Sequence, residues 1–111
     1  MIPTQEQIEQ VMEFAELEPS NEEMLYFFYK GIGETPEYLF SNMNFLTDIR
    51  KKMINEVGIK ETHIYYFETG IRIWDSSSDG RLFHGTGEEL PEAYLNSVIT
   101  YLDSKLLKVK S

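Results

Sequence analysis

The first apolar pattern along the chain is helical and runs from Thr4 to about Glu18. Its apolar residues keep the i, i+3, i+4, i+7 spacing of one helix face: Ile8, Val11, Met12 and Ala15. Residues 4–7 form a capping box at its start, and Pro19 is the predicted stop. A second capping box at residues 20–23 precedes the apolar run 24–29, which predicts a buried second helix ended by Lys30 and Gly31.

Helical spacing returns between Asn42 and Val57, after a short helical turn opened by Pro36, and Gly58 is the predicted terminator. Its apolar face carries Leu46, Ile49, Met53 and Val57, with Arg50, Lys51 and Lys52 off that face. A last helix begins at about Pro91. One face of it carries Leu95, Val98, Ile99, Leu102 and Leu106.

Between these helices the period changes to that of β-strands. The aromatic and β-branched runs 63–67 and 71–74, separated by a turn around Thr69 and Gly70, predict a hairpin. Pairing across this turn sets Tyr66 opposite Ile73 and Phe67 opposite Arg72. Residues 81–84 predict a third short strand, which the glycines at 85 and 87 end.

These elements predict one α+β domain over residues 1–111, because 111 residues suffice for a single core. N-terminal helices come first, then an antiparallel meander of two or three strands, then a C-terminal helix. A sheet of so few strands is not stable alone, so we expect the helices to pack on it.

The chain is acidic, with 19 Asp and Glu against 10 Lys and Arg and a formal net charge of −9. Residues 1–40 hold nine of these carboxylates and a single basic residue, Lys30. Such a field repels nucleic acid and anionic membranes and attracts basic proteins. Since there is no cysteine, no signal peptide pattern and no apolar run of membrane-spanning length, we expect a cytoplasmic protein.

The segment 44–53 closing at Gly58, two strands, and a helix beginning at residues 90–94 together resemble a known group. This group is the small helix-strand-strand-helix proteins of phages and prophages, sometimes called ABA sandwich proteins. The resemblance covers about residues 43–105 and leaves out the two predicted N-terminal helices. It implies an accessory protein of a phage or other mobile element, located in the host cytoplasm, and brings no catalytic residues with it.

Candidate chemistry is sparse. Asp75, Ser77 and Asp79 with Gly80 have the 1, 3, 5, 6 spacing of a calcium loop. However, position 12 is Thr86 where a glutamate is needed, and a strand precedes the loop, so a polar turn is the favoured interpretation. His63 and His84 lack the spacing of metal ligands, and no nucleophile elbow or phosphate loop is complete. We therefore expect no enzymatic activity, no metal and no cofactor.

Two surfaces are candidates for binding a partner protein. The first is an acidic ridge on the first helix, spanning an arc of about 80° at 100° per residue opposite the apolar stripe. Its members are Glu6, Glu9, Glu13 and Glu16. Either it is the solvated face of an amphipathic helix, or it docks on a basic nucleic-acid-handling or defence protein and imitates phosphates as an inhibitor would.

The second candidate surface is one face of the predicted hairpin. One face would carry Ile64, Tyr66, Ile71 and Ile73, and the other His63, Tyr65, Phe67, Arg72 and Trp74. A helix–sheet–helix arrangement would bury both faces, and this layered packing favours a core position for the aromatic face. The alternative is that Tyr65, Phe67 and Trp74 are exposed and bind a partner or a second copy. The sequence thus predicts an interaction module or, alternatively, a self-associating structural subunit.

Overall fold

The computed structural model describes residues 3–20, 22–23 and 25–110, with side chains as far as Lys105 in the last helix. Its elements are α1 (Gln5–Phe14), β1 (Phe27–Tyr29), β2 (Ile32–Glu34), α2 (Pro36–Leu39), α3 (Met43–Val57), β3 (Ile59–Phe67), β4 (Gly70–Ser77), β5 (Leu82–Gly87) and α4 (Leu90–Lys110). Among these described residues, no helix is both long and apolar enough to cross a lipid bilayer.

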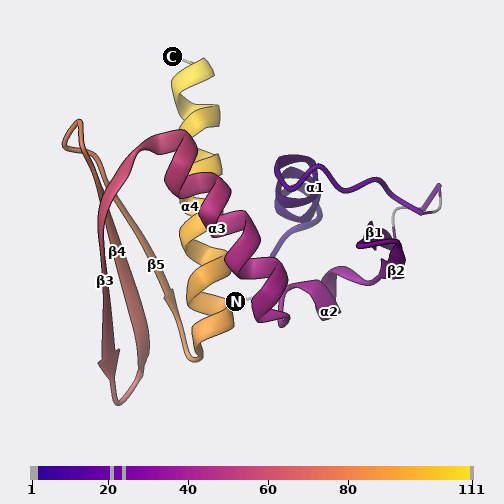
Figure 1. The fold of residues 1–111 in the computed structure, drawn as a ribbon, viewed down its shortest axis with the longest axis horizontal. Coiled ribbons are helices and arrows are strands. Elements are labelled where there is room, and N and C mark those ends of the chain that lie inside the picture. Colours follow the sequence, from indigo (N-terminus) through magenta and orange to yellow (C-terminus); the bar gives the residue numbers. More distant parts are fainter. Residues whose placement is uncertain (1–2, 21, 24, 111) are drawn as a thin grey trace.

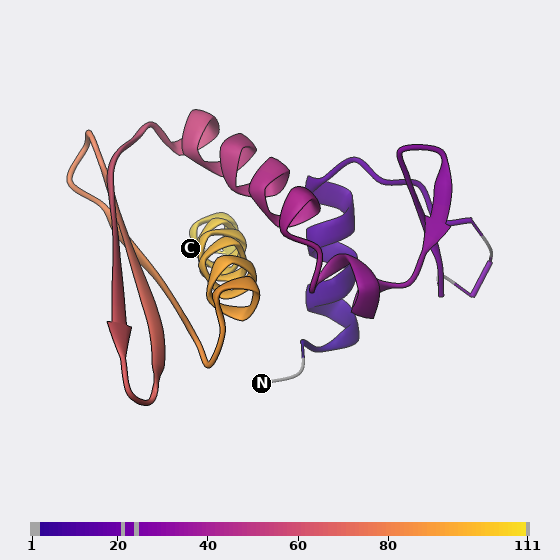
Figure 2. The ribbon, with the colours of Figure 1, turned by 60° about the horizontal axis from the view of Figure 1, so that its bottom comes forward.

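The elements form layers along the longest axis of the molecule (Figure 1). The three-stranded antiparallel sheet, in the order β3-β4-β5, lies at one end, and α4 packs on its strands β5 and β4. Helix α3 packs on α4, and α1 also contacts α4. The small β1–β2 sheet lies at the opposite end in both views (Figures 1 and 2). The α+β class and the packing of helices on the sheet are therefore confirmed.

The core lies between α1, α3 and α4, and Phe83 of β5 joins it from the inner face of the sheet. Its most deeply buried side chains are Val11, Met12, Phe27, Leu39, Phe45, Leu46, Met53, Ile73 and Val98. The predicted apolar faces of α3 and α4 are confirmed as far as Leu102, while the side chain of Leu106 lies outside the described part.

Helix α1 starts as predicted but ends earlier. Both capping-box bonds are present: the Gln7 amide donates to the Thr4 hydroxyl (3.1 Å), and the Thr4 amide donates to the Gln7 side chain (2.9 Å). The helix closes at Phe14 because Glu16 takes a left-handed conformation (φ 59°), with the Leu17 amide bonded to the Met12 carbonyl (3.0 Å). This Schellman ending leaves Glu16 outside the helix.

The predicted helix over residues 20–30 is wrong. Strands β1 and β2 form a hairpin there, with Tyr29 paired to Ile32 across Lys30 and Gly31. Both turn residues have positive φ (52° and 82°), as a type I′ turn requires, and this turn matches the twist of two antiparallel strands. Lys30 and Gly31, the predicted helix stop, are therefore the hairpin turn. Two residues of the predicted helix, Asn21 and Met24, lie outside the described residues.

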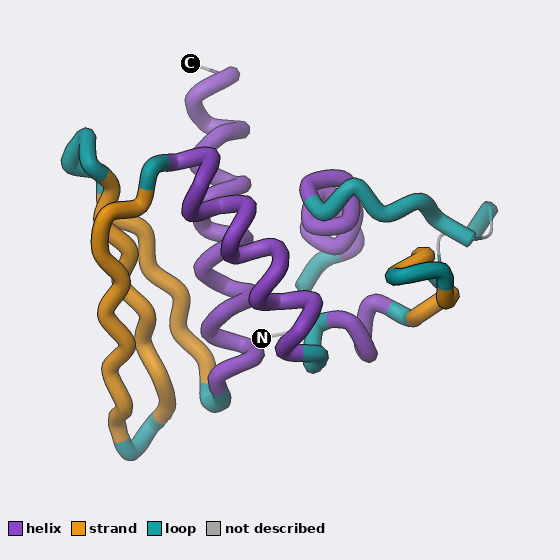
Figure 3. Tube along the Cα trace, in the orientation of Figure 1, coloured by secondary structure: helices purple, strands orange, loops and turns teal. Residues whose placement is uncertain are grey.

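The main hairpin has the predicted strands but a different register. Phe67 pairs with Gly70, and Ile64 pairs with Ile73, across a two-residue loop. The predicted pairing of Tyr66 with Ile73 is wrong by two residues, which preserves the predicted faces because side chains alternate with a period of two. The third strand does not break at Gly85 but continues to Gly87 (Figure 3).

Gly85 lets α4 approach β5 closely. A Cβ at this position would overlap the Ala93 carbonyl oxygen and the Ser97 amide nitrogen, and would lie 2.7 Å from the Ser97 Cα. All three atoms belong to the backbone of α4, which cannot move aside as a side chain can. The glycine therefore sets the distance between the helix and the sheet.

A buried ion pair joins the helices to the sheet. Arg50 of α3 was expected off the apolar face, but it is 5% exposed and binds Asp75 of β4 through both guanidinium nitrogens (2.9 and 2.8 Å). The same guanidinium donates to the Ser97 hydroxyl of α4 (2.6 Å), and the Thr62 hydroxyl of β3 donates to Asp75 (2.7 Å). Four elements thus share one polar cluster.

Replacing Gly85 with alanine is expected to destabilise the fold by about 1–3 kcal/mol or more, because backbone of α4 must be displaced. Urea denaturation of the Gly85→Ala variant measures this loss. Gly33→Ala is the matched control, because a Cβ on this strand glycine meets the Ser20 side chain at an ordinary 3.5 Å. Equal stability of the two variants would contradict the close-approach explanation.

Asp75→Ala is expected to lower the free energy of unfolding by about 3–5 kcal/mol, because it leaves the Arg50 charge buried without its partner. Thermal and urea denaturation measure the change. Asp79→Ala removes a nearby aspartate whose ion pair with Arg81 is exposed, and should lower the free energy of unfolding by much less than Asp75→Ala does. A small effect of Asp75→Ala would show that the ion pair does not hold the layers together.

Candidate functional site

The predicted acidic ridge is only partly assembled. Glu6 and Glu13 are exposed on α1, and Glu9 is half-buried on the same helix. Glu16 lies beyond the helix end and forms an exposed ion pair with Lys52 of α3 (3.3 Å). Three of the four glutamates therefore share the helix, and the fourth leaves it because of the left-handed ending.

The glutamates of this region open onto a surface cavity of about 620 Å³. Its lining combines four carboxylates with four apolar residues: Glu9, Glu13, Glu16 and Glu18 with Met12, Leu17, Pro19 and Phe27. A basic side chain has a matching form, with a charged head on an apolar stem. This cavity is the part of the acidic surface best suited to hold a lysine or arginine.

Exposed apolar side chains also occur in the segment 25–38, and the sequence prediction missed them. They belong to β1, β2, α2 and the segment before β1: Leu25, Tyr26, Phe28, Ile32 and Tyr38. The predicted buried helix contains Leu25, Tyr26 and Phe28, and the sequence predicts no exposed position for Ile32 or Tyr38. The signal that identifies them is Lys30-Gly31 between two runs of strand-forming residues, which is typical of a hairpin turn.

The aromatic sheet face is exposed, so its expected core position is wrong. Helices α3 and α4 both lie on the other side of the sheet (Figures 1 and 2), and no described element covers the outer face. On that face Tyr65 is 47% exposed, Phe67 is 56% exposed and Trp74 is half-buried. With Arg72 they line a shallow cavity of about 230 Å³.

The two histidines lie in one cross-strand row of the outer face. Trp74 pairs with His63 on one side and with His84 on the other. The His84 ring stacks on the indole with a centroid distance of 5.0 Å, and His63 lies 3.4 Å from the Glu61 carboxylate. The indole therefore separates the two imidazoles.

The polar loop that follows Asp75 uses its oxygens internally. Asp75 is held by Arg50, the Ser77 hydroxyl donates to Asp79, and the Arg81 guanidinium donates to both oxygens of Asp79 (3.0 and 2.9 Å). The hydrogen bond from Ser77 and then that from Arg81 lower the Asp79 pKa to about 2. Within the described part of the chain, no three His, Cys, Asp or Glu residues gather as metal ligands would.

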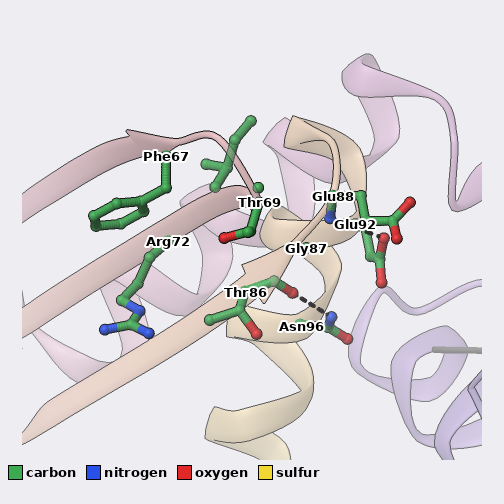
Figure 4. A pocket seen from close by; sticks show the side chains of 10 residues that line it. Phe67, Thr69, Arg72, Thr86, Gly87, Glu88, Glu92 and Asn96 are labelled. Carbon is green, nitrogen blue, oxygen red and sulfur yellow. Dashed lines mark hydrogen bonds between the residues drawn. The ribbon is translucent and has the colours of Figure 1, made fainter.

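A further pocket of about 290 Å³ lies between the tip of the main hairpin and the start of α4 (Figure 4). Its polar residues bond to nearby backbone: the Asn96 amide donates to the Thr86 carbonyl (2.6 Å), and Glu92 accepts from the Glu88 amide (3.2 Å). Arg72 lies over the Phe67 ring, 5.8 Å from its centroid. The first two contacts connect the end of β5 to α4, and the third connects β4 to β3, so each of these polar residues has a structural role.

Comparisons of the chain with protein-family models, curated proteins and solved structures found no match. The surfaces of the molecule itself are therefore the basis for inferring its function.

Replacing Ser77 with alanine should raise the Asp79 pKa from about 2 toward its ordinary value of 3.8, because the hydrogen bond that lowers this pKa most is lost. Arg81→Ala should raise it too, because the Arg81 side chain contributes both a hydrogen bond and a positive charge. Since folding lowers this pKa, the charged carboxylate stabilises the fold above pH 3.8, and the contribution is lost as the pH falls toward 2. Carbon-detected NMR titration of the carboxyl group measures the pKa. An unchanged value in Ser77→Ala would contradict the assignment.

Proposed function

We propose that this protein is a non-enzymatic protein-interaction module whose N-terminal part docks on a basic surface of a partner protein. The proposal rests on one observation: the acidic excess and a group of exposed apolar side chains lie together on the part formed by residues 3–40. Charge attracts the partner, and apolar contact holds it.

The charge is divided unevenly between two regions of the chain. Residues 1–40 hold nine carboxylates and one lysine, whereas residues 41–111 hold ten carboxylates and nine basic residues. The elements of this acidic region, α1, β1, β2 and α2, lie on the side of α3 and α4 that faces away from the three-stranded sheet (Figure 1). This separation supports docking on that side, because a concentrated negative field guides a basic partner to one face.

The acidic N-terminal region also exposes apolar side chains, which a merely solvated helix face would not carry. Tyr26, Phe28 and Ile32 are exposed near Glu22, Glu23 and Glu34 in the sequence, and aromatic residues dominate the energetics of many interfaces. The cavity beside α1 adds a receptor for a single basic side chain. A partner with basic and apolar residues side by side would satisfy both features.

The partner class follows from the sign of the charge. An acidic surface repels phosphates and competes with nucleic acid for basic grooves, so a nucleic-acid-handling or defence protein is the expected partner. Docking there would inhibit that protein. The sequence resemblance to small phage and prophage proteins supports a mobile-element accessory role in the host cytoplasm.

Charge reversal at the cavity should abolish capture of the partner. The immobilised chain is compared with Glu13→Lys/Glu18→Lys and with the control Asp79→Lys/Glu88→Lys, which makes the same net change at two exposed positions away from both the cavity and β3. We expect the unchanged chain and the control to retain a basic protein from host lysate, and the cavity variant to retain none. The amount retained should fall at moderate salt. Equal capture by all three, or none by any, would overturn the proposal.

A second pair of variants separates docking from general charge attraction. Phe28→Ser leaves the charge unchanged and removes an exposed aromatic anchor, so the captured partner should bind at least about tenfold more weakly. Leu82→Ser removes a similarly exposed apolar side chain from β5, on the edge of the sheet opposite β3, and should leave the affinity unchanged. Titration of the purified partner measures both dissociation constants, and equal values would remove the anchor from the proposal.

A further inference from the structure

Strand β3 is an edge strand with an unusually open surface. Among the described elements it has a neighbouring strand, β4, on one side only, and α4 covers β5 and β4 instead. Every residue from Lys60 to Phe67 is exposed, including those on the inner face of the sheet. Tyr66 on that inner face is 71% exposed. Its backbone edge and both side-chain faces are therefore accessible.

The features that normally protect an edge strand are missing from its second half. Edge strands are usually protected by lysine, proline, a bulge or a covering element. In β3 the register irregularity lies at its start, between Ile59 and Glu61, next to Lys60. Residues 62–67 (Thr-His-Ile-Tyr-Tyr-Phe) contain no lysine, proline or carboxylate and favour strand pairing.

We infer that a second copy of this chain pairs with β3, antiparallel to it, and joins the two sheets into one of six strands. The two copies would be related by a two-fold axis near Ile64, as in most homodimers. Backbone hydrogen bonds along the edge would supply affinity, and the side chains on both faces would pack against those of the second copy.

Charge favours a second copy at this place and in this direction. Lys60 lies near the start of the strand and Glu68 directly follows its end, and both are exposed. Antiparallel pairing about Ile64 sets each Lys60 opposite the other copy's Glu68, whereas parallel pairing would bring like charges together. The sheet lies at the end of the molecule remote from the acidic elements, so the two acidic ends point away from each other (Figure 2).

The available area is sufficient for a dimer. Tyr65, Tyr66 and Phe67 expose 47, 71 and 56% of their surfaces. At roughly 200 Å² per aromatic side chain, these three alone supply about 350 Å² per copy, over half of what each partner contributes to a small stable interface. Ile64, the half-buried Trp74 and the strand backbone add to this area.

The test uses the full chain. Because it contains no cysteine, any disulfide formed by a single-cysteine variant must involve the introduced residue. Cysteine is introduced in turn at each position from Thr62 to Phe67, and mild oxidation forms the cross-link. We expect disulfide-linked dimers to form most efficiently at Ile64 and less efficiently toward either end. Leu82→Cys, on the opposite edge strand and 57% exposed, is the control and should not cross-link. A flat profile, or efficient cross-linking of Leu82→Cys, would overturn the proposed pairing.

Sedimentation gives an independent measurement. The unmodified chain should show a dimer whose population rises with concentration and changes little with salt. Tyr66→Lys should weaken the dimer at least about tenfold by placing a charge at the edge, while Leu82→Lys should not. A chain that stays monomeric at the highest reachable concentration, or a dimer unaffected by Tyr66→Lys, would refute the inference. Because Glu13→Lys/Glu18→Lys leaves β3 unchanged, this result is independent of partner docking.

Discussion

The buried ion pair between Arg50 and Asp75 is the constraint on which the rest of the fold depends. A guanidinium and a carboxylate removed from water are tolerated only if each satisfies the other, and here the hydroxyls of Ser97 and Thr62 complete the cluster. Since its members come from α3, β3, β4 and α4, these four elements must reach their places together. The pair also fixes which face of the sheet meets the helices, because Asp75 points inward. The alternation of the strand then turns Trp74 and its neighbours outward.

The close contact of α4 with β5 determines which part of the sheet stays uncovered. Gly85 draws the helix against one edge of the sheet, and a single helix is about 10 Å wide, close to the width of two strands. Strand β3, third from the helix, therefore extends beyond the covered region. Its exposed aromatic residues follow from this geometry.

Periodicity predicted the parts of the fold whose signals are local and consistent. The apolar faces of α3 and α4, the Gly58 terminator and the two faces of the main hairpin were all predictable because pattern, caps and turns agree there. At residues 20–30 the local signals conflict, since a capping box precedes aromatic residues that pair equally well as strands. Arg50 could not be placed from sequence, because its partner is 25 residues away and lysines follow it. The exposure of Tyr65 and Phe67 depends on where α4 packs, which no local pattern encodes.

The two proposed surfaces lie at opposite ends of a molecule about 40 Å long, and this separation lets them act together. Repulsion between acidic regions is screened within about 8 Å at physiological salt, so a dimer joined at the sheet ends would not oppose its own formation. Such a dimer would present two acidic surfaces facing outward. Against a partner that is itself dimeric or repeated along a filament, the second contact would form at a high effective concentration and strengthen binding without any new interface. The near-neutral charge of residues 41–111 is what makes this arrangement physically possible, because an acidic excess spread over the whole chain would also repel a second copy at β3.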